Sequence, residues 1–101
     1  MAPLKIQFTA KARRELRDVL GFIAQDNPQA ASDLASRIME GLEHKTRFPK
    51  SGRLIPEVPE HPARELVLPP CRIFYLTDKT TLTVLSIIRT ERLLRTEQLG
   101  N

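Results

Sequence analysis

Residues 23–31 read Ile-Ala-Gln-Asp-Asn-Pro-Gln-Ala-Ala, and this short stretch decides the fold of the chain. Asn27 is a favourable helix N-cap, and Pro28 suits the first position of a helix because no N–H donor is needed there. A second helix therefore begins here, directly after a first helix that we expect to end near Gln25. Two helices joined by so short a link must fold back on each other as an antiparallel hairpin.

Both predicted helices carry apolar side chains at helical spacing. Thr9 offers a hydroxyl as N-cap of the first helix, and Pro49 ends the second because a proline disfavours helix in the residue before it. The first apolar stripe comprises Ala12, Leu16, Val19, Leu20 and Ile23, and the second comprises Ala31, Leu34, Ala35, Ile38 and Leu42. Each helix is therefore amphipathic and needs an apolar surface to pack against.

The sequence on both sides of the hairpin predicts β-strands. Residues 4–8 alternate apolar and polar, as a half-buried strand does. Residues 49–62 show no periodicity and read as a long loop. Three strand-like runs follow with short connections, which predicts an antiparallel meander; they are residues 64–68, 71–76 and 80–88. We therefore expect one α+β domain over residues 1–101: an N-terminal strand, an antiparallel two-helix hairpin and a three-stranded antiparallel meander. The hairpin covers one face of the sheet, so the other face must be covered by something or remain exposed.

Composition narrows the class of protein. The 101 residues include 16 Lys and Arg against 12 Asp and Glu, a net charge of +4 that suits an acidic partner or a nucleic acid. No apolar run approaches the ~20 residues of a membrane helix, and residues 1–10 do not read as a secretory signal. The single cysteine, Cys71, has no metal-binding spacing with His44 or His61 and is expected to be a small buried hydrophobe. We expect a cytosolic protein without metal or cofactor.

Several stretches, in order and over nearly the whole chain, resemble the RelE/ParE toxin superfamily, and its ParE-type toxins in particular. They are residues 23–31, Phe48–Arg53 with Pro56-Glu57, Arg64–Val67, Arg72–Tyr75 and Leu85–Arg92. The resemblance implies the toxin of a type II toxin–antitoxin system. Its ParE branch is similar to proteins that poison DNA gyrase and block replication, whereas its RelE branch cleaves messenger RNA on the ribosome. Both branches share the fold, so the choice depends on the site.

RNA cleavage needs a general base, positive charge at the phosphate and a general acid. Arg89 stands where the family commonly has histidine, no tyrosine or histidine follows Tyr75, and neither histidine of the chain is well placed. Tyr75 itself reads more readily as core than as an acid. The remaining candidate bases are Glu57, Glu65 and Lys50. We therefore expect no catalytic residue. If the protein is an RNase, its site would comprise Arg53, Arg64, Arg72, Tyr75, Arg89 and Arg92.

The resemblance also implies partners. An antitoxin of the ParD or RelB kind, with an acidic C-terminal tail, would cover the free face and edge of the sheet. For Arg64 and Arg72 the alternative is pairing with Glu65 inside the chain. The expected antitoxin contacts are Lys11, Arg14, Arg17, Arg64 and Arg72. The expected gyrase contacts are Arg89, Arg92 and Arg95, at the start of a basic tail (residues 90–101) that forms a short helix or stays mobile.

DNA would be contacted only indirectly, through the antitoxin complex. The leading hypothesis is thus a gyrase poison. Its alternatives are a ribosome-dependent endoribonuclease and a non-toxic co-repressor.

Overall fold

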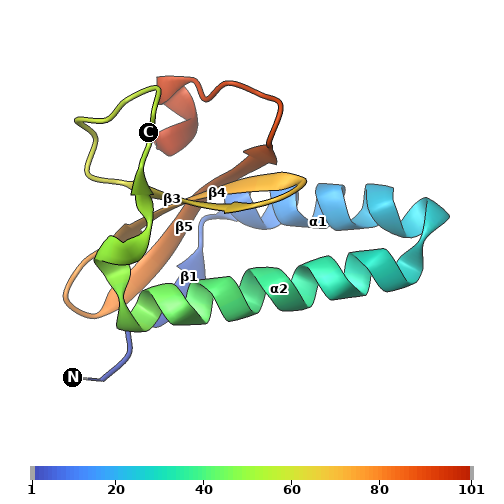
Figure 1. The fold of residues 1–101 in the computed structure, drawn as a ribbon, viewed down its shortest axis with the longest axis horizontal. Helices are drawn as coiled ribbons and strands as arrows, with labels where there is room; N and C mark the ends of the chain where they lie inside the picture. Colours follow the sequence, from blue (N-terminus) through green and yellow to red (C-terminus); the bar gives the residue numbers. More distant parts are fainter. Residues whose placement is uncertain (1, 101) are drawn as a thin grey trace.

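The computed structural model describes residues 2–100, so the end residues of the predicted domain and tail, Met1 and Asn101, lie outside the described residues. A strand and a helix hairpin are followed by four strands and a closing 3-10 helix (Figure 1). The elements are β1 (Lys5–Phe8), α1 (Ala10–Asp26), α2 (Pro28–Arg47), η1 (Pro49–Ser51), β2 (Arg53–Leu54), β3 (Arg64–Leu68), β4 (Cys71–Thr77), β5 (Thr81–Arg89) and η2 (Thr96–Leu99).

The helix hairpin begins and turns where its capping residues predict. The Thr9 hydroxyl accepts a hydrogen bond from the Ala12 N–H at 3.0 Å, and the Asn27 side chain accepts one from the Ala30 N–H at 3.1 Å. Asn27 is the only residue between α1 and α2, so the predicted antiparallel hairpin is confirmed. Neither helix, nor any other in residues 2–100, is long and apolar enough to cross a membrane.

The five strands form one sheet in the order β1-β5-β4-β3-β2. Strands β3, β4 and β5 are the predicted antiparallel meander. Strand β1 pairs in parallel with β5, and at the opposite edge Arg53 of β2 lies beside Glu65 of β3. The sequence did not reveal β2, because a two-residue strand within a loop carries no periodicity.

The helices pack on one face of the sheet over the main core. Cys71 is fully buried there, as predicted, and burial raises the pKa of its thiol. A register shift pairs Tyr75 with Val84 but Phe74 with Ser86, so Leu85 is an extra residue in β5. This bulge reverses the alternation of side chains, which explains why Val84 and Ile87 both belong to the core beneath the helices.

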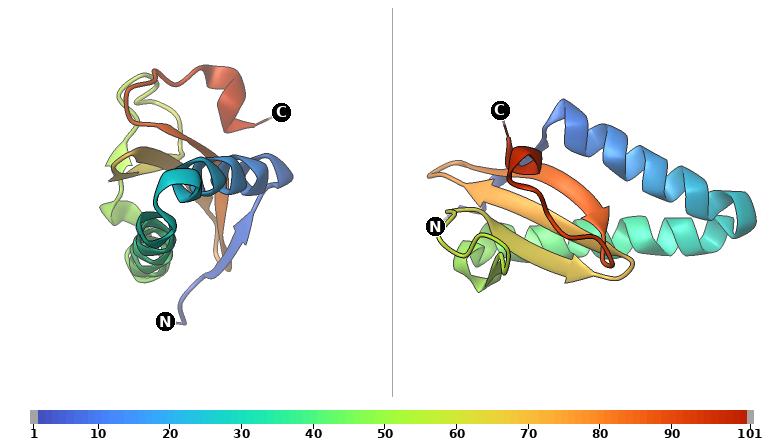
Figure 2. Two further views of the ribbon diagram at one scale, coloured as in Figure 1. Left: turned by 90° about the vertical axis from the view of Figure 1, so that its right-hand side faces the viewer. Right: turned by 90° about the horizontal axis from the view of Figure 1, so that it is seen from above.

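The chain itself covers part of the opposite face of the sheet. Part of the face that an antitoxin was expected to cover is therefore occupied by the chain itself, while Val67 on the same face stays 39% exposed. The loop before β3 and the C-terminal segment lie across it, as both views of Figure 2 show. Their apolar side chains bury Phe74 and Ile88 in a second cluster, together with Ile55, Ala63, Leu94 and Leu99. The Lys11 ammonium fastens this segment by donating to the Gln98 carbonyl oxygen at 2.9 Å.

Candidate functional site

A buried ion network lies beneath the start of the C-terminal segment, with Arg72 of β4 at its centre. The Arg72 side chain is only 7% exposed, and that of Glu65, on the neighbouring strand β3, is fully buried. The Arg72 guanidinium donates to both carboxylate oxygens of Glu65. It also donates to both oxygens of Glu57, at 2.7 Å each. Because Glu57 belongs to the loop between β2 and β3, the network ties that loop to the sheet.

All five N–H groups of Arg72 are used within the chain. Four donate to Glu57 and Glu65, and the fifth donates to the backbone carbonyl oxygen of Arg92 at 2.8 Å. The hydrogen bonds to the two carboxylates raise the pKa of Arg72 further above its ordinary value. A phosphate or an antitoxin carboxylate would have to displace these partners. Arg72 was expected to contact a partner or a phosphate. Its donors instead hold Glu57, Glu65 and the backbone at Arg92 in position.

Glu57 connects the loop, the sheet and the C-terminal segment. Besides Arg72, it accepts a hydrogen bond from the Leu94 N–H at 2.8 Å. The hydrogen bonds from Arg72 are the main reason why the pKa of Glu57 falls from 4.5 to about 2. The carboxylate therefore stays charged in mildly acidic solution and keeps the three segments together.

We expect the free energy of unfolding to fall as the pH is lowered from 4.5 to about 2. Because the pKa of Glu57 is lower in the folded state, its stabilising contribution is complete above the unfolded-state pKa and is lost as the pH drops through the folded-state value. Urea unfolding of the wild type and of Glu57→Gln across this range tests the prediction. The variant should be less stable at neutral pH and should lose less on acidification. Parallel curves for the two proteins would show that another group is responsible.

The residues named for RNA cleavage do not form an accessible acid–base pair among residues 2–100. Tyr75, the candidate acid, is 1% exposed and donates its hydroxyl hydrogen to the Pro49 carbonyl oxygen at 2.9 Å. Burial raises the pKa of Tyr75, which makes it a weaker acid. Two candidate bases, Glu57 and Glu65, are bound to Arg72, and the third, Lys50, is exposed on η1.

Two of the arginines named for RNA cleavage, Arg53 and Arg64, are also held by contacts within the chain, and so is His61. Arg53 donates from Nε to Glu65 at 3.1 Å, and Arg64 donates to the Gly52 carbonyl oxygen at 2.9 Å. The His61 ring accepts a hydrogen bond from the Ala63 N–H within its own loop. The arginines thus line the sheet half of the molecule, and of the three candidate bases only the exposed Lys50 is not bound to Arg72.

The three arginines expected to contact a target all lie at the end of β5 and in the segment after it. Arg89 pairs with Glu91 at 2.6 Å, and its guanidinium lies 5.8 Å from the ring centre of Phe22. Arg92 and Arg95 are exposed. Their side chains therefore extend from a segment whose backbone is fixed by Arg72 and Glu57.

The basic residues of α1 divide into two groups. Lys11, expected at the antitoxin, donates instead to the Ser86 hydroxyl and to the Gln98 carbonyl oxygen, both at 2.9 Å. Arg14 and Arg17 are exposed on the outer surface of the helix. Of the three residues of α1 that were expected to contact an antitoxin, Arg14 and Arg17 are therefore the better candidates.

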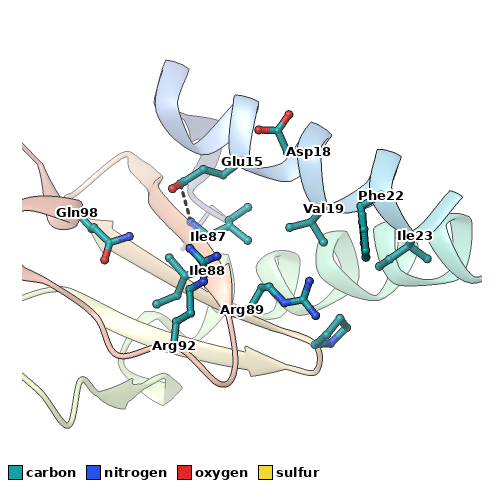
Figure 3. Close-up of a pocket in the computed structure, with 11 residues that line it drawn as sticks. Glu15, Asp18, Val19, Phe22, Ile23, Ile87, Ile88, Arg89, Arg92 and Gln98 are labelled. Atoms are coloured by element: carbon teal, nitrogen blue, oxygen red, sulfur yellow. Dashed lines mark hydrogen bonds between the residues drawn. The ribbon is translucent and has the colours of Figure 1, made fainter. Parts of the chain in front are cut away.

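A groove of about 350 Å³ separates α1 from the second half of β5 (Figure 3). Strand β1 ends opposite Val84, so the edge of β5 beyond that residue faces this groove instead of a strand. The Glu15 carboxylate accepts the Ile87 N–H there at 3.0 Å. Phe22 lines the groove and is 61% exposed. The sequence prediction missed this groove, although an aromatic residue off the apolar stripe of α1 was a usable signal.

A strand, a two-helix hairpin and an antiparallel sheet closed by a basic C-terminal segment define an α+β domain of the RelE/ParE class. The family described as ParE toxin of type II toxin-antitoxin system, parDE, matches residues 6–94. The chain therefore belongs to the ParE toxin family and is the toxin of a type II toxin–antitoxin system.

Solved structures agree with this assignment at the level of the fold. A chain of the chromosomal ParDE system from P. aeruginosa is 23% identical, with a TM-score of 0.70 over 87% of this chain and 97% of that chain. A chain of the RelBE2 toxin–antitoxin complex from Mycobacterium tuberculosis is 22% identical, with a TM-score of 0.58 over 87% of this chain and 99% of that chain. No curated protein sequence matches the chain significantly.

Proposed function

We propose that this toxin inhibits DNA gyrase in the cytoplasm by binding it, and so blocks replication and growth. The observation that carries the proposal is the state of the candidate catalytic groups. Tyr75 is buried, and Glu57 and Glu65 are bound to Arg72. A cleavage mechanism needs a mobile proton at the reacting oxygen, whereas a binding mechanism needs only an ordered surface. The match to ParE toxins supports the same choice.

The target-binding surface in this proposal is the C-terminal segment with Arg92 and Arg95, beside Arg89. Arginine is enriched among the residues that dominate binding energy at protein interfaces. The segment is held to the sheet on both sides of Leu93, so little ordering entropy is lost on binding.

The antitoxin in this proposal binds at the groove between α1 and β5. It is a protein of the ParD or RelB kind, and its acidic C-terminal tail lies near Arg14 and Arg17. The tail inserts apolar side chains beside Phe22 and follows the edge of β5 beyond Val84. Both solved relatives come from toxin–antitoxin systems, which supports a cognate antitoxin as the partner. Contact with DNA is made through the antitoxin.

Purified toxin should inhibit gyrase supercoiling, and added cognate antitoxin should restore it. The double variant Arg92→Ala, Arg95→Ala should need about tenfold more protein for half-inhibition, because truncating a dominant interface arginine costs more than ~1 kcal/mol. Arg13→Ala, which removes an exposed arginine of α1, is the matched control and should behave as wild type.

The same protein is tested for transcript cleavage during in vitro translation. Cleaved message with unaffected gyrase would replace the proposal by a ribosome-dependent endoribonuclease. Inactivity in both assays, with repression of the operon retained, would indicate a non-toxic co-repressor.

A further inference from the structure

Leu93 is unusually exposed for a large apolar residue. Its exposed fraction is 80%, the highest among the large hydrophobic side chains of residues 2–100. The next residue, Leu94, is 6% exposed and packs in the second apolar cluster with Phe74 and Ile88. With Leu94 anchored inward, Leu93 extends into solvent from the surface of the sheet.

The backbone on both sides of Leu93 is held by the buried ion network. Before it, the Arg92 carbonyl oxygen accepts a hydrogen bond from Arg72 at 2.8 Å; after it, the Leu94 N–H donates to Glu57 at 2.8 Å. The Arg92 N–H also donates to the Arg89 carbonyl oxygen at 3.0 Å, which closes the turn. Leu93 is thus presented on a fixed backbone instead of a mobile tail.

This use of Arg72 goes beyond what stability requires. Burying a charged group costs desolvation, and apolar residues of similar volume often stabilise a core at least as well as a buried ion pair. Arg72 and Glu57, however, also bond to the backbone at Arg92 and Leu94, which an apolar replacement could not do. The network therefore fixes the position of the turn that carries Leu93.

The surroundings of Leu93 specify the chemistry of a partner. Leu93 and the partly exposed Val67 line a shallow depression of about 360 Å³, together with Arg53 and Arg92. Glu57, which also lines it, is already bound to Arg72, and Glu91 is bound to Arg89. Arg53 is likewise paired, with Glu65, so the charge left for a partner is the positive charge of the exposed Arg92, beside an apolar centre. This combination fits a protein surface with an apolar pocket and an acidic rim, because phosphates would bind the arginines and gain nothing from the leucine.

We propose that Leu93 is the apolar anchor by which this toxin binds its protein target, and that Arg72 and Glu57 are positioning residues for it. The inference rests on the proposed inhibition of gyrase and names the side chain that dominates it. Arg92 and Arg95 surround the anchor and meet carboxylates of the target.

The test compares Leu93→Ala, Leu93→Met and wild type in gyrase supercoiling, with thermal unfolding as a check on the fold. Leu93→Ala should unfold at the wild-type temperature, because the side chain is exposed. It should nevertheless need about tenfold more protein for half-inhibition, because the complex loses the burial of a leucine side chain in the target's pocket. Leu93→Met should stay close to wild type, since it preserves apolar volume. Leu54→Ala removes another exposed leucine, 51% exposed on β2, and should inhibit like wild type.

The outcomes separate this inference from the proposed function. If wild type inhibits gyrase and Leu93→Ala inhibits it equally, the anchor proposal alone is overturned. If Leu93→Ala loses affinity for the antitoxin but not inhibition of gyrase, Leu93 is an antitoxin contact and the proposal is again overturned. If wild type leaves gyrase unaffected, both proposals fail together.

Discussion

Replacing Arg72 by methionine is expected to lower the free energy of unfolding by about 3–5 kcal/mol, because removing one partner of a buried ion pair leaves the other charge without compensation. Here Glu57 loses its ion-pair partner, and the fully buried Glu65 keeps only the largely exposed Arg53. The Arg92 carbonyl oxygen also loses its donor, so the C-terminal segment is released from the sheet. Urea unfolding at neutral pH measures the loss. Binding of a fluorescent dye to exposed apolar surface should rise as the second cluster opens.

Two further variants test whether the buried ion network accounts for the loss of stability in Arg72→Met. Arg53→Met removes a guanidinium that also contacts Glu65 but is 57% exposed, and it should cost about 1 kcal/mol or less. Adding Glu57→Gln and Glu65→Gln to Arg72→Met should recover part of the lost stability, because the uncompensated charges are gone. A loss below about 1 kcal/mol in Arg72→Met would mean that the apolar cluster, and not the ion network, holds the segment.

Gly52→Ala is the second large effect that we expect, with a loss of about 1–3 kcal/mol from overpacking. A Cβ atom at position 52 would overlap the hydroxyl oxygen of Tyr75 and would stand 2.8 Å from its Cζ. Tyr75 cannot swing aside easily, because it is 1% exposed and its hydroxyl is bonded to Pro49. Urea unfolding again measures the cost, and a crystal structure of the variant should show η1 displaced from β4.

A second glycine variant and a tyrosine variant complete this test. Gly21 lies in α1, and a Cβ atom added there would have open space around it, with nothing within 4 Å. Gly21→Ala should therefore stabilise the protein by about 0.5–1 kcal/mol through helix propensity. Tyr75→Phe removes the overlapping oxygen but leaves the ring carbons close to position 52. The double variant with Gly52→Ala should therefore be less damaging than the sum of the two single losses. Strict additivity would argue against a direct clash.

The capping signals and periodicities predicted the elements well because they act between near neighbours. Thr9 and Asn27 bond to N–H groups three residues away, so their effect is visible in a short window of sequence. The meander followed from strands separated by short turns. The parallel pairing of β1 with β5 joins residues 76 positions apart, such as Lys5 and Thr81. A local sequence pattern cannot predict a pairing over that distance.

The candidate site was harder to predict, because the same arginine can bind a partner or hold the fold. Arg64 and Arg72 both lie on strands of the meander and carry the same role in the sequence-based prediction. Arg64 donates to one carbonyl oxygen, that of Gly52, whereas Arg72 is enclosed by two carboxylates and the Arg92 carbonyl oxygen, 7, 15 and 20 positions away in sequence. Which acidic groups surround an arginine depends on how the loop and the tail cross the sheet. Composition cannot reveal that.

The stretch at residues 23–31 by itself determined the helix hairpin, because Asn27 is a favourable N-cap and Pro28 suits the first position of a helix. The order of elements and the resemblance to the family came from the pattern of the whole sequence. Only the tertiary structure decided what the basic residues do. It bound Lys11 to the tail, buried Arg72 beneath it, and left Arg92, Leu93 and Arg95 at the surface. The physical reason is that periodicity and capping are local properties of the backbone. Burial and ion pairing arise only when distant segments pack together.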